Sequence, residues 1–281
     1  MVNIMLLRKK KLTILIALII VFVLTISYIL FNPLISKPKG TKFEDISEII
    51  EKVYNKEELT SEEYLKLSIQ TGLSKTSIEV FLTKYNPDYL LKYQEDHIYN
   101  TKEIKSSFFI GSYQLELVNN HLPFIDIKDG DVLITSTSHT FGYRHGHSGI
   151  VIEADKALTL ESYTPFVDSK YDKLYTWLAF KDVMVLRLKE EYRHLIPNII
   201  EFAKNKLVGV KYSLLASTKD KISKDNNIKR TQCSHLVWAA FYSEGIDLNS
   251  DGSWLVTAND ISRSSYLEVV EVKGFNYLEL W

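Results

Sequence analysis

The sequence predicts an α+β fold in which an antiparallel sheet packs on helices. In the second half of the chain, short β-rich runs with hairpin-like turns are followed by helical stretches. The 281 residues are 46% hydrophobic and 25% charged, a composition typical of globular proteins that excludes a disordered chain, a collagen or a coiled coil. An uncharged apolar run near the N-terminus precedes this body.

The first forty residues differ from the rest of the chain in charge and hydropathy. They contain six basic residues and no acidic one, whereas the remainder carries 28 basic and 35 acidic residues. This acidic body argues against a nucleic-acid partner, because such proteins normally present a basic face. Residues 12–31 carry no charge, and a helix of that length spans about 30 Å, the thickness of a bilayer core.

The charge pattern around the apolar run predicts its topology. A basic cluster lies directly before the run, which predicts a cytoplasmic tail at 1–11 and a single-pass signal anchor at 12–31. The protein would then sit in the cell membrane with its body outside the cytoplasm. The alternative is a secreted protein after signal cleavage, but a signal peptide has a shorter apolar region and a small-residue cleavage site. Residues 32–42 are interpreted as a linker.

Residues 43–104 are predicted to form a helical region that is a possible cap on the rest of the chain. Apolar residues recur at helix spacing from Phe43 to Val53, and Ser61 and Ser74 begin two further helical patterns. No residue of this region carries obvious chemistry. Whether it occludes a cleft stays open.

Residues 105–281 are predicted to form the domain that carries the chemistry. Gly130 and Asp131 indicate a turn, after which β-rich runs follow. These runs lie at 132–135, 148–153, 158–163 and 183–188. Helices are predicted at about 197–207 and 232–243, and the lysine-rich stretch 219–230 is interpreted as a solvated loop.

Cys233 is the single cysteine of the chain, so it has no partner for an intramolecular disulfide. Thr231 stands where a helix cap is expected, which puts Cys233 in the first turn of a buried helix. The positive end of a helix stabilises a thiolate, and the N–H groups of Cys233 and Ser234 could face a developing oxyanion. The alternative interpretation is a buried, inert thiol.

A thiolate nucleophile needs a base and a group that orients the base. His147 opens the strand at 148–153, where its ring can project into a cleft at the end of the sheet. Glu161 lies inside an otherwise apolar run, which is unusual for a strand that faces a core. A glutamate bonded to the imidazole would fix its tautomer and support the imidazolium. Whether the two side chains share a face depends on hairpin register, which the sequence leaves open.

Four segments together resemble the circularly permuted NlpC-type cysteine hydrolases, papain-like proteins in which the histidine precedes the cysteine. The segments are Gly130-Asp131-Val-Leu, His147-Ser-Gly-Ile-Val-Ile, Leu160-Glu161-Ser162 and Gln232-Cys233-Ser-His-Leu-Val-Trp. The similarity covers about residues 105–281, and the nearest branch is the YiiX/YebB-like group, with lecithin:retinol acyltransferase more distant. The strand and the helix are fairly specific together and weak apart.

The resemblance implies a permuted papain-like fold and a role for individual residues. Cys233 is expected to be the nucleophile, His147 the general base and Glu161 the orienting residue. The expected substrate-binding or oxyanion residues are Ser234, Tyr212 and His145. Among them, Tyr212 lies where the family often places a tyrosine near the cysteine.

These features predict a membrane-anchored, extracytoplasmic cysteine hydrolase that cleaves an amide or ester bond through a thioester, without a metal or cofactor. Family and location suggest a cell-wall peptide as the substrate. A lipid amidase or acyltransferase is the alternative within the same fold. A non-catalytic wall- or lipid-binding module is the alternative outside enzymes.

Other residues have competing interpretations. Zinc is an alternative for three histidines that include a His-x-His pattern, namely His139, His145 and His147. Residues 247–252 match the first half of a calcium loop, but the later glutamate is missing, so a polar turn is preferred. His235 lies about 200° around the helix from Cys233 and is interpreted as structural. Trp238 and Trp254 are interpreted as packing residues, with a cleft-lining role left open for Trp254.

Overall fold

The computed structural model describes most of the chain. The described residues are 2–31, 40–99, 103–104, 110–112, 114–115, 122–140, 143–220, 222 and 228–278. Within them, side chains are not described at 2–9, 27–31, 99, 103–104, 110–112, 114–115, 140 and 143. Most of the predicted linker at 32–42 therefore lies outside the described residues. The chain divides into two compact units, Met1–Ser36 and Lys37–Trp281.

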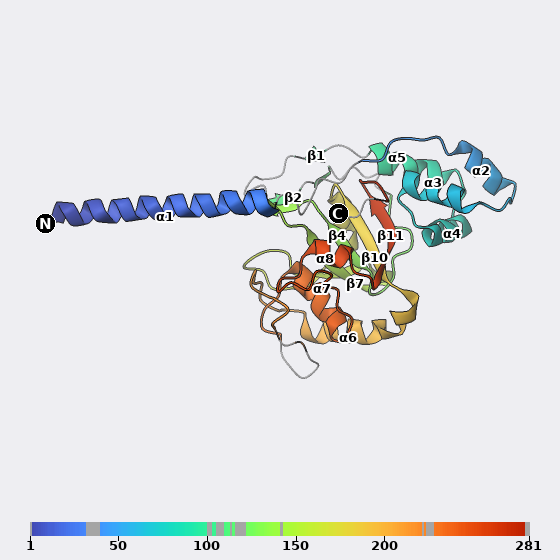
Figure 1. Cartoon of the computed structure of the whole chain (residues 1–281). Coiled ribbons are helices and arrows are strands. Elements are labelled where there is room, and N and C mark those ends of the chain that lie inside the picture. Colours follow the sequence, from blue (N-terminus) through green and yellow to red (C-terminus); the bar gives the residue numbers. More distant parts are fainter. Residues whose placement is uncertain are drawn as a thin grey trace. The chain divides into compact units, whose positions relative to one another are not determined.

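The described part of the first unit is the helix α1, which spans Val2–Phe31 (Figure 1). It includes the predicted signal anchor at 12–31. Within the described part of the chain, no helix combines the length and the hydropathy needed to cross a bilayer. The membrane anchor stays a prediction.

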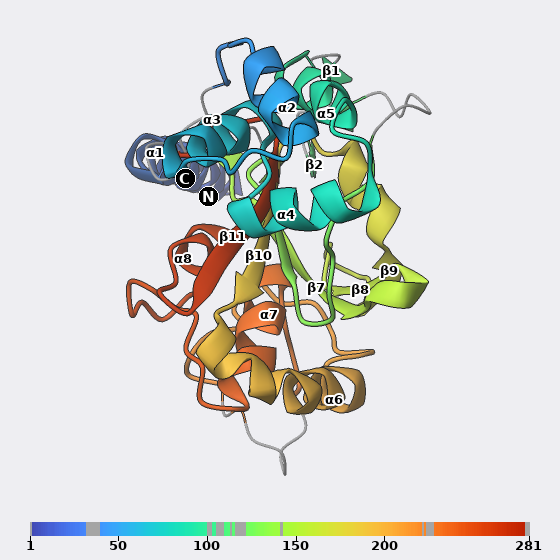
Figure 2. The ribbon, with the colours of Figure 1, turned by 90° about the vertical axis from the view of Figure 1, so that its right-hand side faces the viewer.

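A six-stranded antiparallel sheet forms the centre of the second unit, and the predicted α+β class is confirmed. The strands follow the order β11-β10-β4-β7-β8-β9, of which Figure 2 labels all but β4. Their bounds are β4 Val132–Thr135, β7 His147–Glu153, β8 Leu158–Glu161, β9 Lys170–Lys173, β10 Val183–Leu188 and β11 Leu267–Lys273. Because β4 and β10 are buried at every position, both faces of the sheet are covered there.

Two helices cover one face of the sheet. α7, Cys233–Tyr242, packs against β7, and α6, Ile196–Lys206, packs against α7 (Figures 1 and 2). The short helix α8, Ala258–Ser262, follows the same side and begins with a capping box. Residues 234–241 of α7 are all buried, as the nearly continuous apolar sequence of this helix requires. The predicted positions of α6 and α7 are confirmed to within two residues.

The opposite face is covered by the 3₁₀ segments η2 Ala154–Lys156 and η3 Leu174–Ala179 and by a second apolar cluster. A third 3₁₀ segment, η4 Glu190–Leu195, leads into α6 and packs on the apolar core under α6 and α7. Trp177 of η3 is fully buried and packs with Phe180, Leu133 and Val151. Small strand pairs complete the unit: β1 Glu103–Ile104 with β3 Gln114–Leu115, and β2 Ile110–Ser112 with β5 Ser138–Thr140 and β6 Tyr143–Arg144.

The predicted helical region consists of four helices with their own core. They are α2 Ser47–Tyr54, α3 Ser61–Thr71, α4 Lys75–Lys84 and α5 Tyr89–Tyr99. The chain turns after α3 at Gly72, whose φ of 75° is left-handed and whose carbonyl accepts a hydrogen bond from Val272 N at 2.7 Å. Ser74 N donates to Val270 O at 2.9 Å. The helical region is thus attached to β11, the edge strand, three strands away from β7 (Figure 2).

Candidate active site

The start of α7 is built by Gln232. Its backbone is extended, its side-chain Oε1 accepts a hydrogen bond from Ser234 N at 2.9 Å, and its Nε2 donates to Val256 O at 3.0 Å. The predicted cap, Thr231, is therefore wrong by one residue. Thr231 is instead buried and pairs with Tyr212 in a parallel bridge. The sequence did not indicate the capping role of Gln232, because glutamine is an uncommon helix cap whereas threonine is a frequent one.

Cys233 is the first residue of α7, and its side chain is partly exposed. Its thiol donates to Gln232 Oε1 at 3.3 Å, and Ser234 Oγ lies 3.8 Å from the sulfur. The Ser234 N–H is committed to Gln232, which differs from its expected role as an oxyanion donor. The Cys233 N–H, at the first helical position, lies outside the helix hydrogen-bond ladder and is suited to that role.

The structure brings His147 and Glu161 together. His147 Nε2 and Glu161 Oε2 are 2.7 Å apart, and both side chains are buried. In the hairpin register Glu161 pairs with Gly149, two residues along β7 from His147. A Cβ atom at Gly149 would lie 2.9 Å from Glu161 Cγ and 3.0 Å from Trp177 Cζ2. The absence of a side chain at Gly149 therefore leaves room for the carboxylate to lie across β7.

The second oxygen of Glu161 is also occupied. Its Oε1 accepts hydrogen bonds from Thr159 Oγ1 at 2.6 Å and from Trp177 Nε1 at 2.8 Å. Burial alone would raise the pKa of Glu161, but the bonds from His147, Thr159 and Trp177 outweigh it and lower the pKa. The carboxylate is thus held ionised and in one orientation.

Aromatic rings fix the plane of the His147 imidazole. Trp177 stacks on it with ring centroids 5.2 Å apart and planes 15° apart, and Tyr163 meets it edge-on at 4.7 Å. The Cys233 side chain is the other ionisable neighbour of this imidazole, and it raises the pKa of the ring. Because the Glu161 carboxylate is held ionised, the Cys233 thiol is the neighbour that can give the ring a proton.

The electrostatics of Cys233, His147 and Glu161 favour proton transfer from the Cys233 sulfur to a ring nitrogen of His147. Burial opposes a charged imidazole, but hydrogen bonding and attraction from Cys233 and Glu161 raise the pKa of His147 to about 9. Burial would raise the pKa of Cys233, but its bond to His147 and the attraction of that ring lower it below the ordinary value. Both shifts act in the same direction and favour the thiolate–imidazolium pair over the neutral pair.

The other expected site residues are placed as follows. Tyr212 is half-buried beside Cys233; burial and the negative charge of the thiolate raise the pKa of its hydroxyl, which stays a hydrogen-bond donor. Ser234 is buried, and its Oγ lies 3.3 Å from Ser148 Oγ. His145 is exposed, and its Nδ1 lies 2.8 Å from Gly146 O.

The residues for which the sequence left other roles open lie as follows. Among the described residues, no group of three or more His, Cys, Asp or Glu side chains is placed to hold a metal ion. Asp247 accepts hydrogen bonds from Trp238 Nε1 at 2.8 Å and Asn249 N at 3.0 Å, as a polar turn does. His235 is fully buried and lies 3.1 Å from Thr231 Oγ1. The packing role expected for Trp254 is wrong, because this side chain is 51% exposed.

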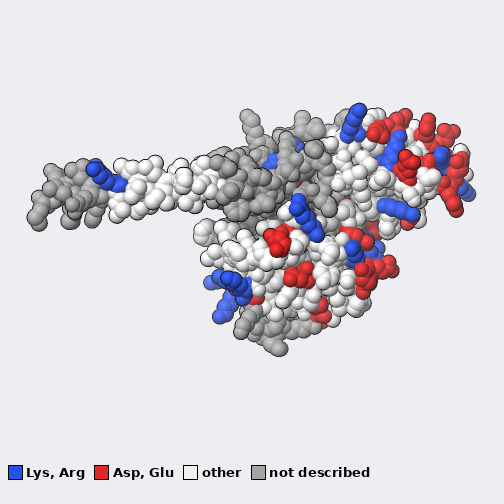
Figure 3. Space-filling model, viewed as in Figure 1, with Lys and Arg blue, Asp and Glu red and all other residues white. Residues whose placement is uncertain are grey.

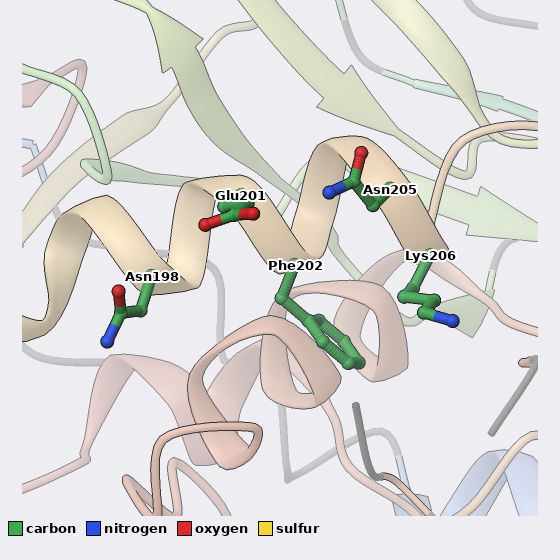
Figure 4. Close-up of a pocket in the computed structure, with 5 residues that line it drawn as sticks. All are labelled: Asn198, Glu201, Phe202, Asn205 and Lys206. Atoms are coloured by element: carbon green, nitrogen blue, oxygen red, sulfur yellow. The ribbon is translucent and has the colours of Figure 1, made fainter. Parts of the chain in front are cut away.

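Two surface hollows are lined by residues other than Cys233, His147 and Glu161. One, of about 210 Å³, is lined by residues of α6: Asn198, Glu201, Phe202, Asn205 and Lys206 (Figure 4). The other, of about 500 Å³, is lined by residues of α2 and α3 and of the segments that lead into them, and is rich in glutamate. Neither contains a residue of the candidate site, so neither bears on the chemistry of Cys233.

Three residues of the site are not among those the sequence indicated. Thr159 shares a strand face with Glu161 because it lies two residues before it, so alternation along the strand was an available signal. Gln232 stands next to Cys233, but its capping role depends on Val256 far along the chain. Trp177 reaches the site from η3 and has no local signal at all.

Comparisons of this chain with protein-family models, curated proteins and solved structures find no match. The resemblance to NlpC-type hydrolases stays a prediction based on the motif residues.

Proposed function

We propose that this protein is a cysteine hydrolase that cleaves an amide or ester bond through a thioester intermediate. The observation that supports it most is the buried His147–Glu161 pair beside the half-buried Cys233 in the first turn of a helix, where Cys233 and Glu161 raise the pKa of His147. A structural cysteine needs neither a base nor an oriented carboxylate. Perturbed pKa values in one cluster are typical of functional sites.

In the first half-reaction, the Cys233 thiolate attacks the substrate carbonyl carbon, and the C=O electron pair moves onto oxygen. The Cys233 N–H and the Tyr212 hydroxyl are the donors available to this oxyanion. The tetrahedral intermediate then collapses to a thioester. The bond to the leaving amine or alcohol breaks as the His147 imidazolium gives that group its proton.

In the second half-reaction, neutral His147 takes a proton from water as the water oxygen attacks the thioester carbon. Collapse of this intermediate breaks the C–S bond, releases the carboxylic acid and leaves the thiolate beside the imidazolium. Glu161 stays ionised throughout and keeps Nε2–H directed toward itself, so the other ring nitrogen faces the sulfur. The same thioester transferred to another acceptor would make the enzyme an acyltransferase.

The proposal extends to fold and location. The fold is proposed to be the permuted papain-like type, since the histidine strand precedes the cysteine helix and both meet at one end of the sheet. The anchor at 12–31 is proposed to hold the enzyme at the outer face of the cell membrane. A cell-wall peptide is the proposed substrate, and a lipid amide or ester is the alternative.

The first test is the pH dependence of alkylation by iodoacetamide. Because the chain has one cysteine, the mass increase reports Cys233 alone. In the wild type we expect labelling well below the free thiol pKa of about 8.5, and loss of this fast labelling in His147→Ala. His194→Ala, which removes an exposed histidine, is the matched control and keeps the wild-type profile.

Slow labelling that is the same in wild type and His147→Ala would exclude the enzyme and favour a non-catalytic module. If the fast profile is found, turnover follows with an anilide probe, whose leaving amine must take a proton. Turnover should rise with pH as the thiolate forms and fall as pH passes about 9, where His147 loses its proton. Cys233→Ser should abolish it.

A further inference from the structure

Three loops beside the candidate site expose large apolar side chains. We call this set the apolar rim; it comprises Phe166, Val167, Val208, Leu214, Leu215 and Trp254. Phe166 is fully exposed at 104%, Leu214 at 69% and Leu215 at 62%. Single exposed apolar residues are ordinary on any protein, but a group on adjoining loops indicates a surface that contacts something other than water.

Hydrogen bonds hold the three loops together. Ser169 N donates to Val210 O at 2.9 Å, and Gly209 N donates back to Ser169 O at 2.8 Å, which joins the first loop to the second. Thr218 N donates to Trp254 O at 3.0 Å, which joins the second loop to the third. The rim is therefore one preorganised surface on the folded unit.

The rim adjoins the reacting groups. Tyr163, at the start of the first loop, meets the His147 ring at 4.7 Å. Tyr212, in the second loop, lies beside Cys233, and the next residue, Ser213, donates its N–H to Thr231 O at 2.7 Å. Whatever contacts the rim is thus brought to the entrance of the site.

Phe166, the most exposed residue of the rim, has a strained backbone conformation. Its φ is 71°, in the left-handed region that a bulky residue rarely adopts. A strained backbone is maintained when the rest of the structure imposes it, and such positions concentrate at functional sites. Phe166 thus adopts a rare backbone conformation although its ring is fully exposed.

Charged side chains of both signs surround the rim. The second loop carries exposed Lys211 and Lys219, and its following acid, Asp220, is bound by Arg230 at 2.9 Å, whereas the first and third loops carry exposed Asp168 and Asp251. In Figure 3, basic side chains gather at the lower left, whereas acidic ones gather over the helical region at the right. Apolar and aromatic side chains flanked by lysines are the composition of surfaces that rest on membranes.

The length of the linker at 32–42 also favours a lipid surface as the partner of the rim. With 12–31 in the bilayer, the eleven residues of the linker 32–42 reach at most about 40 Å when fully extended. The second unit is then tethered within that reach of the membrane. We propose that the apolar rim docks on the lipid surface that the chain is anchored to, so that the site opens at the level of the head groups; this inference rests on the anchoring in the proposed function.

The test measures the depth of the rim in a bilayer. The full chain, with Cys233→Ala, receives Phe166→Cys, carries a nitroxide there and is reconstituted in vesicles of phosphatidylcholine and phosphatidylglycerol. We expect the label to be several-fold more accessible to oxygen than to an aqueous nickel chelate. The matched control is Tyr85→Cys, an exposed aromatic of the helical region, whose label should stay accessible to the nickel chelate.

A Phe166 label that resembles the Tyr85 label would overturn the docking, as would release of the full chain from vesicles by carbonate. Spin–spin broadening at Phe166 without immersion would assign the rim to a second copy and also overturn it. The outcome is separable from the proposed function. Fast alkylation of Cys233 in detergent without immersion rejects docking alone, and immersion with slow, pH-independent alkylation rejects the enzyme alone.

Discussion

Two clusters of buried charge lie in the same sheet, and they differ in what they leave open. In one, Arg187 of β10 binds Asp131 through two bonds of 2.8 Å and Asp126 at 2.7 Å. In the other, His147 of β7 binds Glu161 at 2.7 Å and lies beside the half-buried Cys233. The first cluster consists of an arginine and two carboxylates alone, whereas the second also includes a thiol.

The difference teaches what separates a structural charge from a reactive one. Arginine stays protonated at every relevant pH, so the cluster around Arg187 can only attract and orient. Histidine changes charge within the physiological range, and its neighbour Cys233 can supply the proton. Burial and hydrogen bonding are similar in the two clusters, so these alone do not identify a site. Proton exchange with an accessible nucleophile does.

The largest effect is expected from breaking the structural cluster. Arg187→Met leaves Asp126 and Asp131 without their buried partner, and the free energy of unfolding should fall by about 3–5 kcal/mol, measured by urea unfolding. In the fraction that stays folded, Cys233 alkylation should be unchanged. Arg193→Met, which breaks an exposed pair with Glu268, is the control and should cost about 0–1 kcal/mol. Equal losses in both variants would contradict the comparison.

A smaller effect, on both stability and reactivity, is expected from Trp177→Phe. The variant keeps a ring over His147 but loses the bond from Nε1 to Glu161, at a cost of about 1.5–3 kcal/mol in unfolding free energy. Alkylation of Cys233 at pH 6 should slow at the same time. Trp238→Phe is a close match, because its Nε1 also donates to a carboxylate at 2.8 Å, that of Asp247.

Trp238→Phe should lose stability without slowing alkylation, measured under conditions where both variants are folded. If both variants slow alkylation equally, the effect is a general loosening of the fold and Trp177 has no special part in positioning Glu161.

The smallest expected effect comes from Glu161→Gln. Without the carboxylate charge the pKa of His147 falls from about 9 and the pKa of Cys233 rises, so the pH range of the ion pair narrows from both sides. A change of one pKa unit corresponds to about tenfold slower alkylation at pH 6. Glu153→Gln, at a more exposed carboxylate paired with Lys156 and Lys204, should leave the profile unchanged. A Glu161→Gln profile identical to the wild type would show that the charge of Glu161 plays no part.

Much of the fold followed from local pattern, and the misses have physical causes. β7, β8 and β10 were predictable because each lies in a short β-rich run next to a turn signal or a helix. β9, Lys170–Lys173, has a polar sequence and forms because it pairs with the edge of β8. β11 alternates in sequence, but it buries Glu271, whose carboxylate accepts the Ile125 N–H at 3.0 Å. A buried acid of this kind is visible only once its distant partner is known.

The candidate site divides in the same way. The first-turn position of Cys233 and the strand-end position of His147 followed from local signals. Their meeting with Glu161 depended on hairpin register, which the packing of two strands decides. Trp177 and Gln232 act through contacts with distant residues, which no spacing rule predicts.

Gly149 has no side chain, and this has a consequence for how the proposed active site could be regulated. Glu161 lies against the backbone of β7 itself, so the separation of base and acid is that of two hydrogen-bonded strands. Neighbouring strands keep a nearly constant spacing of about 4.8 Å, so the backbones that carry the two side chains stay at one separation while the sheet is folded. In the proposed hydrolase, we therefore expect regulation to act on admission of the substrate at the loops.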